Sequence, residues 1–101
     1  MAPEAPWKRI EREEARKLGG KRIPIGTPGA PDVESDWLCV EIKARKRLPT
    51  WIKEALRSAR AKAKDNQLGI VSLHEMREHD SLILISRDDF INWFGEGRGA
   101  K

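Results

Sequence analysis

The stretch PDVESDWLCVEIK, residues 31–43, decides the fold that the sequence predicts. From Leu38 to Lys43 apolar and polar side chains alternate, which is the period of a β-strand with one buried face. The alternation places Glu41 and Lys43 on the same polar face of that strand. We therefore expect a strand over 38–43 that carries a carboxylate and an ammonium group side by side.

The residues before this strand predict a hairpin. The Glu-Ser-Asp sequence at 34–36 is typical of a tight turn, so a short strand that ends near Val33 can fold back beside the next one. Such a hairpin can bring Asp32 close to Glu41 across the strand pair. Two carboxylates and a lysine at one point suit a divalent metal ion and a phosphate better than they suit a protein core.

Length and charge distribution bound the class of protein. The chain has 101 residues, 36% charged and 39% hydrophobic, and is expected to fold as one globular domain with a modest core. The net charge is +4, but residues 41–64 contain nine Lys and Arg against two acids, whereas residues 1–40 are neutral and residues 65–101 carry −3. Positive charge that begins at the paired carboxylates favours an acidic partner such as nucleic acid.

Cysteine usage and apolar runs exclude other classes. The lone cysteine, Cys39, excludes an intrachain disulfide and a cysteine-rich zinc motif. The sequence shows neither the pattern of a signal peptide nor an apolar run long enough to span a membrane. We expect a cytoplasmic protein without membrane contact, in a prokaryotic cell or a phage-infected host.

Before the hairpin, the sequence predicts a flexible arm over 1–6 and a helix over 7–18 that ends at Gly19-Gly20. One face of the helix contains Trp7, Glu11, Ala15 and Leu18. Glu11 therefore lies among apolar positions. Either Glu11 and Glu14 pair with basic side chains one turn away, or Glu11 contributes a third carboxylate to the site.

The remaining segments complete an α/β pattern. We expect a strand over 21–25, a helix starting at Pro49-Thr50 with Thr50 as N-cap, strands over 68–73 and 81–85, and a helix to residue 94 opened by a capping box from Ser86 to Asp89. The buried stripe of the long helix comprises Ile52, Ala55, Leu56, Ala59 and Ala63. The connection over 74–80 contains two histidines without the spacing of a metal site.

This order, α-β-β-β-α-β-β-α, predicts a mixed central sheet of about five strands flanked by helices. The predicted domain covers residues 7–94, and residues 95–101 are expected to form a flexible tail. Within it, basic residues follow the carboxylates, and further basic residues recur at helical spacing along one face of the helix after Thr50. Acidic residues do not alternate with them, as they would in a helix whose surface charges pair with one another. This basic face of the helix either contacts phosphates or is an ordinary solvated surface. The predicted nucleic-acid-binding residues are Arg45, Lys46, Arg47, Lys53, Arg57, Arg60 and Lys64.

These motifs in this order resemble the PD-(D/E)XK nuclease superfamily, and within it the compact archaeal-type Holliday junction resolvases. The matching residues are Pro31-Asp32, Glu41-Ile42-Lys43 and, in the preceding helix, Glu11-Arg12-Glu13. The same order of elements continues to about residue 94. The resemblance implies a restriction-endonuclease-like core.

The resemblance also implies a site and an activity. Glu11, Asp32 and Glu41 would hold Mg²⁺ or Mn²⁺ together with the carbonyl of Ile42, and Lys43 would act with these acids in catalysis. Glu14 is the alternative to Glu11. The implied activity is endonucleolytic cleavage of DNA four-way junctions in recombination and repair, by a homodimer whose two-fold symmetry supplies paired cuts that leave 5′-phosphate and 3′-hydroxyl ends.

Two other functions fit the same residues. A nuclease of this fold can act on flaps, free ends or duplex DNA instead of junctions. A non-catalytic DNA-binding module can use the acids structurally, although buried carboxylates without a cation are destabilising.

Overall fold

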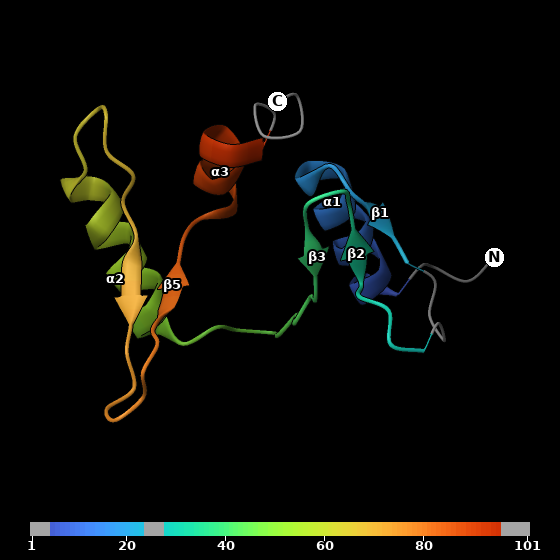
Figure 1. Cartoon of the computed structure of the whole chain (residues 1–101), viewed down its shortest axis with the longest axis horizontal. Helices are drawn as coiled ribbons and strands as arrows, with labels where there is room; N and C mark the ends of the chain where they lie inside the picture. The colour runs from blue at the N-terminus through green and yellow to red at the C-terminus, as the bar shows by residue number, and fades with distance from the viewer. Residues whose placement is uncertain (1–4, 24–27, 96–101) are drawn as a thin grey trace. The chain divides into compact units, whose positions relative to one another are not determined.

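The computed structural model describes residues 5–23 and 28–95 (Figure 1). The elements in chain order are α1 (Pro6–Leu18), β1 (Lys21–Arg22), β2 (Val33–Glu34), β3 (Cys39–Val40), α2 (Thr50–Lys62), β4 (Val71–Leu73), β5 (Leu82–Leu84), α3 (Arg87–Phe90) and the π-helix η1 (Ile91–Gly95). The protein is therefore mixed α/β, and the predicted order of elements is confirmed. The strands form two antiparallel sheets, β1-β2-β3 and β4-β5.

The chain divides into two compact units, Met1–Arg45 with Phe94–Lys101, and Lys46–Trp93. The first unit contains α1 and the three-stranded sheet, and the second contains α2, the two-stranded sheet and α3. In the described part of the chain, no helix has the length and apolar character needed to cross a membrane.

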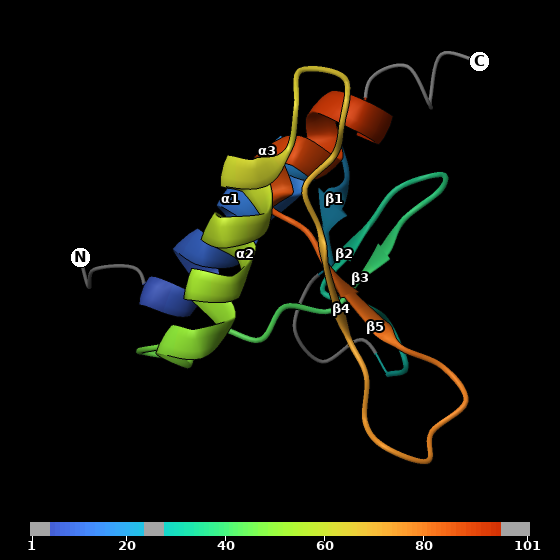
Figure 2. The ribbon, with the colours of Figure 1, turned by 90° about the vertical axis from the view of Figure 1, so that its left-hand side faces the viewer.

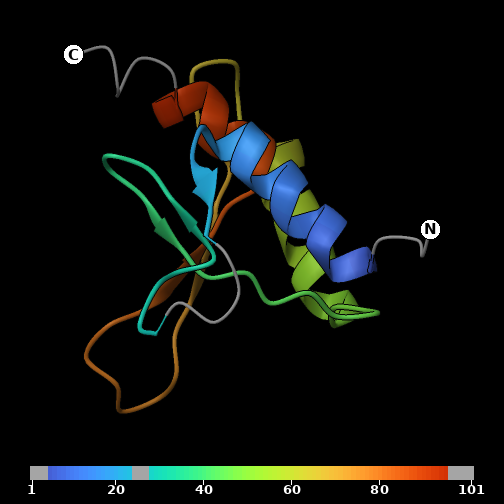
Figure 3. The same cartoon turned by 90° about the vertical axis from the view of Figure 1, so that its right-hand side faces the viewer.

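In the first unit, α1 packs against β1 and β2 (Figure 3). It ends at Gly19, whose φ of 75° gives the left-handed cap that was predicted there. Its inner face buries Ala15, and Val33 of β2 is also buried. The helix begins at Pro6, which is the last residue of the arm predicted over 1–6. Proline is favoured in the first helical turn because its fixed φ suits a helix. Residues 1–4 lie outside the described residues.

The predicted hairpin between β2 and β3 is confirmed, with Val33 opposite Val40 and Glu34 opposite Cys39. Ser35 closes its turn: its backbone N–H donates to the Leu38 carbonyl at 2.9 Å, and its hydroxyl accepts from the Leu38 N–H at 3.2 Å. The tight turn therefore occurs where the polar residues of the sequence indicated it.

The strand predicted over 38–43 is shorter, because β3 ends at Val40. The N–H of Ile42 donates to the side chain of Asp32 rather than to a backbone carbonyl, which ends the ladder. On the other side of β2, β1 places Arg22 opposite Val33. The strand predicted over 21–25 is observed as Lys21–Arg22, and its last two residues lie outside the described residues.

In the second unit, α2 runs alongside β4 (Figure 2). Its half-buried side chains include the five of the predicted stripe, Ile52, Ala55, Leu56, Ala59 and, just after the helix, Ala63. Thr50 is not the N-cap that was predicted. Pro49 takes that position, because its carbonyl accepts from the N–H groups of Ile52 and Lys53 at 3.2 and 3.5 Å.

The strands β4 and β5 pair with Val71 opposite Leu84 and Leu73 opposite Leu82, and both are shorter than predicted. The chain enters β4 through Gly69, which is buried. A Cβ at this position would lie 2.7 Å from both the Ala59 carbonyl oxygen and the Arg60 Cα. Glycine therefore permits the close approach of this segment to α2.

Half of the predicted capping box before α3 is confirmed: the Ser86 hydroxyl accepts from the Asp89 N–H at 3.0 Å, whereas the Asp89 carboxylate is bonded to Arg60. The helical segment continues as η1 to Gly95, so the tail predicted over 95–101 begins one residue too early. Residues 96–101 lie outside the described residues.

Candidate functional site

The backbone of Asp32 is fixed from both sides in the three-stranded sheet. Its N–H donates to the Val40 carbonyl at 2.9 Å, and its carbonyl accepts from the Ile23 N–H at 2.9 Å. In the hairpin register Val40 is already opposite Val33, so the bond from the Asp32 N–H to the same residue interrupts the regular ladder at Asp32. That Asp32 lies close to Glu41 across the hairpin therefore stays a prediction.

The side chain of Asp32 reaches the Glu41–Lys43 triplet directly. Its Oδ2 accepts from the Ile42 N–H at 2.6 Å, a short bond typical of a carboxylate acceptor. The side chain is half-buried, which limits the competition from water for this bond. The bond therefore joins the two sequence motifs, Pro-Asp and Glu-x-Lys, at one end of the hairpin.

Glu41 and Lys43 form an ion pair with each other. The Lys43 Nζ lies 3.1 Å from Glu41 Oε2, and the two side chains are 68% and 67% exposed. An ion pair this exposed is worth about 0–1 kcal/mol. Both groups can therefore exchange this pairing for a cation and a phosphate at little cost.

Glu11 lies on the inner face of α1, as its place among apolar residues predicted. Its carboxylate accepts from the Arg22 Nε at 3.2 Å, and the two side chains are only 14% and 26% exposed. Arg22 reaches it from β1, because α1 packs on that strand. Glu11 is therefore paired across elements, and not with a basic residue one turn away along the helix.

The structure brings Asp32 to the Glu-x-Lys triplet but does not gather the three predicted acids. Over residues 5–23 and 28–95, no group of three His, Cys, Asp or Glu side chains is close enough to hold a metal ion. The pair at the hairpin nevertheless has suitable donors. Mg²⁺ takes oxygen ligands, keeps several waters and is usually held by one or two carboxylates, which Asp32 and Glu41 can supply.

The predicted nucleic-acid-binding residues differ in their surroundings. Arg45 is exposed and donates to the neighbouring Ala44 carbonyl at 2.9 Å. Arg60 makes two bonds to Asp89, from Nε at 2.8 Å and from Nη2 at 3.2 Å. All the predicted residues in the second unit, Arg60 included, are exposed: Lys46, Arg47, Lys53, Arg57, Arg60 and Lys64. Arg60 differs from the others in its two bonds to Asp89, so we treat it separately.

Asp89 is the residue that most affects the pKa of Arg60. The hydrogen bond to Asp89 and its charge, with a smaller effect of Asp88, raise the pKa of the Arg60 guanidinium above its usual value. The backbone N–H of the same aspartate donates to the Ser86 hydroxyl, which fixes Asp89 in the first turn of α3. The pair thus links α2 to the start of α3, a structural role that the spacing of basic residues on α2 did not reveal.

This structural role predicts that Arg60→Ala lowers the melting temperature, whereas Arg57→Ala leaves it unchanged. Arg60 is bound in two places to Asp89, and Arg57 is an exposed residue of the same helix. Thermal unfolding followed by circular dichroism measures both variants. Equal melting temperatures for the two would show that the Arg60–Asp89 pair does not stabilise the fold.

Sequence reasoning missed Arg22 as the partner of Glu11. Arg22 lies in the segment 21–25, whose alternating residues indicated a strand, but the alternation did not indicate that α1 would pack on that strand.

Comparison of the chain with protein-family models, with curated proteins and with solved structures finds no match.

Proposed function

We propose that this protein is a metal-dependent DNA endonuclease, most specifically a Holliday junction resolvase that acts as a homodimer. The observation that supports it best is the 2.6 Å bond from the Ile42 N–H to Asp32, which joins the Pro-Asp and Glu-x-Lys motifs. The proposal includes a restriction-endonuclease-like core. Its place of action is the cytoplasm, where DNA of a prokaryotic or phage-infected cell is accessible.

In this proposal Asp32 and Glu41 hold Mg²⁺ or Mn²⁺, with the Ile42 carbonyl as a further ligand and Glu11 completing the set. The bound ion lowers the pKa of a coordinated water and neutralises charge on the phosphate. The Ile42 N–H fixes the Asp32 carboxylate, so its orientation is set before a cation binds. Glu11 joins only if its bond to Arg22 breaks, because that bond now occupies its carboxylate.

Lys43 is the residue that acts on the scissile phosphate. Its side chain is 68% exposed and is ion-paired with Glu41, and binding of a cation by Glu41 would release it. Once released, Lys43 orients the attacking water and stabilises the charge that develops on the phosphate oxygens. The basic run Arg45-Lys46-Arg47 and the basic face of α2 bind further phosphates of the DNA.

A cleavage assay on four DNA substrates tests the proposal. Equal amounts of a labelled four-way junction, flap, duplex and single strand are incubated with the protein in Mg²⁺, in Mn²⁺ and in chelator. Paired symmetric cuts in the junction alone, lost in chelator, are expected. Cuts in flap or duplex would keep the site and change the substrate, whereas binding without any cutting would contradict the enzymatic proposal.

The cations of α2 give a second test, through Arg57→Ala. Arg57 is exposed and shares one face of α2 with Lys53, so its loss should weaken junction binding and reduce the salt slope of log K by about 1. Lys62→Ala is the matched control, because nine residues at about 100° each place Lys62 on the side opposite Lys53. Binding is measured by gel shift in chelator over a range of salt concentrations.

The salt slope separates the possible results. A reduced slope for Arg57→Ala with a wild-type slope for Lys62→Ala supports phosphate contact by that face. Identical slopes for wild type and Arg57→Ala would make it a solvated surface.

A further inference from the structure

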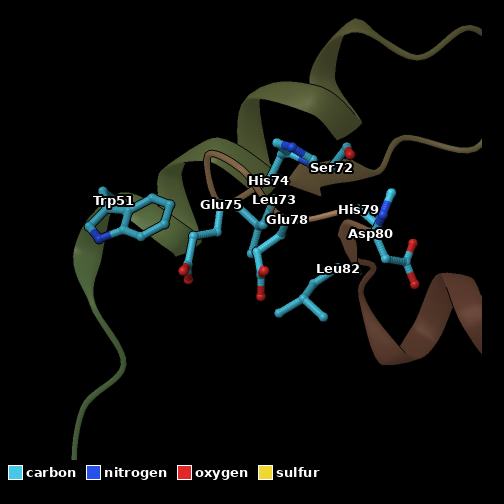
Figure 4. Close-up of a pocket in the computed structure, with 9 residues that line it drawn as sticks. All are labelled: Trp51, Ser72, Leu73, His74, Glu75, Glu78, His79, Asp80 and Leu82. Carbon is cyan, nitrogen blue, oxygen red and sulfur yellow. The ribbon is translucent and has the colours of Figure 1, made fainter.

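A cavity of about 810 Å³ lies in the second unit, between the start of α2 and the loop that joins β4 to β5 (Figure 4). Its apolar part is formed by Trp51, Leu73 and Leu82. Trp51 is 60% exposed and Leu82 is 73% exposed, so apolar surface of both remains open to a ligand. This cavity is formed by none of the carboxylates assigned to the metal site.

The polar part of the cavity is set by a tight turn. The Glu78 N–H donates to the Glu75 carbonyl at 3.1 Å, and Arg77 has a left-handed φ of 74°, the value that a type II turn has at its third residue. The turn thereby holds Glu75 and Glu78 at its two ends. Figure 4 shows the two carboxylates pointing the same way, into the space between Trp51 and Leu82.

Neither carboxylate is neutralised by its surroundings. Within the described residues, Glu75 and Glu78 take part in no ion pair and in no side-chain hydrogen bond. Two like charges that line the same cavity repel each other, and a cation bound between them would remove that repulsion. Among the described side chains, neither of the two histidines in the lining, His74 and His79, forms an ion pair with these carboxylates, and the Nδ1 of His74 is bonded to the Ser81 hydroxyl at 2.7 Å.

We infer that this cavity binds an arginine side chain presented by a basic segment of a partner protein. The carboxylates of Glu75 and Glu78 match the forked donors of a guanidinium, and the indole of Trp51 offers a face on which the planar group stacks. Leu73 and Leu82 cover the apolar stem of the side chain. A small metal ion would use the carboxylates but would leave the indole and the two leucines without a role.

The test is an NMR titration of the wild-type chain with a blocked Leu-Arg-Leu peptide, with Leu-Gln-Leu as its uncharged counterpart. The chain has four tryptophans, so their indole N–H peaks are first assigned by Trp→Phe substitution. The Trp51 peak is expected to shift saturably with the arginine peptide and to stay in place with the glutamine peptide. The peaks of Trp7, Trp37 and Trp93 are expected to stay in place with both.

A charge variant identifies the cavity. The double substitution Glu75→Gln with Glu78→Gln is expected to weaken peptide binding at least about tenfold. Glu54→Gln, an exposed residue of α2 that does not line the cavity, should leave it unchanged. A Trp51 indole peak that does not shift when the arginine peptide is added overturns the inference. So does a Trp51 peak that shifts with protein concentration alone, since a second copy would then occupy the cavity.

Discussion

An Asp32→Asn variant is expected to lose at least about 100-fold of its junction cleavage in Mg²⁺, while its affinity for the junction stays within a few-fold of wild type. Asparagine has the shape of aspartate, and its carbonyl oxygen can accept the same bond from the Ile42 N–H. The hairpin therefore remains in register. What the substitution removes is the negative charge that the proposed function assigns to holding the cation.

Two measurements on this variant separate catalysis from binding. Cleavage is measured in single turnover with excess protein, and affinity by gel shift in chelator. Asp36→Asn is the matched control, because Asp36 is an exposed residue in the turn of the same hairpin and belongs to no predicted ligand set. Full activity of Asp32→Asn would falsify the site assignment, and an equal loss in both variants would indicate a general effect of charge.

A Gly69→Ala variant is expected to destabilise the second unit by about 1–3 kcal/mol. The added methyl would lie 2.7 Å from the Ala59 carbonyl oxygen and from the Arg60 Cα, which are backbone atoms of a helix and cannot turn aside as a side chain can. Relief requires that β4 move away from α2. That movement would expose part of the half-buried stripe of α2.

Urea unfolding monitored by far-UV circular dichroism measures this loss of stability. Ser72→Ala is a suitable control, since Ser72 is exposed on the neighbouring strand β4 and makes no comparable approach. A midpoint for Gly69→Ala equal to that of wild type would mean that the segment lies farther from α2 than the structure shows. A drop in both variants would point instead to the weakness of the two-stranded sheet.

The hairpin was predictable because its two signals are local. Period-two alternation located the strand after Leu38, and the polar residues at 34–36 indicated the turn that sets Val33 opposite Val40. The end of β3 at Val40 was not predictable, because it depends on a side chain outside the strand. Asp32 takes the N–H of Ile42 from the ladder, and alternation of residue types contains no trace of that competition.

The pairings between distant elements show the same limit. The bond between Glu11 and Arg22 spans eleven positions, and that between Arg60 and Asp89 spans twenty-nine. Helical spacing identifies neighbours only three or four residues apart. It therefore suggested basic partners one turn away for Glu11, and contact with nucleic acid for Arg60. Whether Glu11 joins Asp32 and Glu41 around a cation remains a prediction.

The exposed thiol of Cys39 has a practical consequence for experiments on this protein. Cys39 is the lone cysteine of the chain, and it precedes Glu41 by two residues on the strand that pairs with β2. A nitroxide or a fluorophore can therefore be attached to the native sequence, two residues from Glu41, without altering any of the hairpin carboxylates. Paramagnetic broadening of such a label by Mn²⁺ reports the location of the ion independently of DNA cleavage.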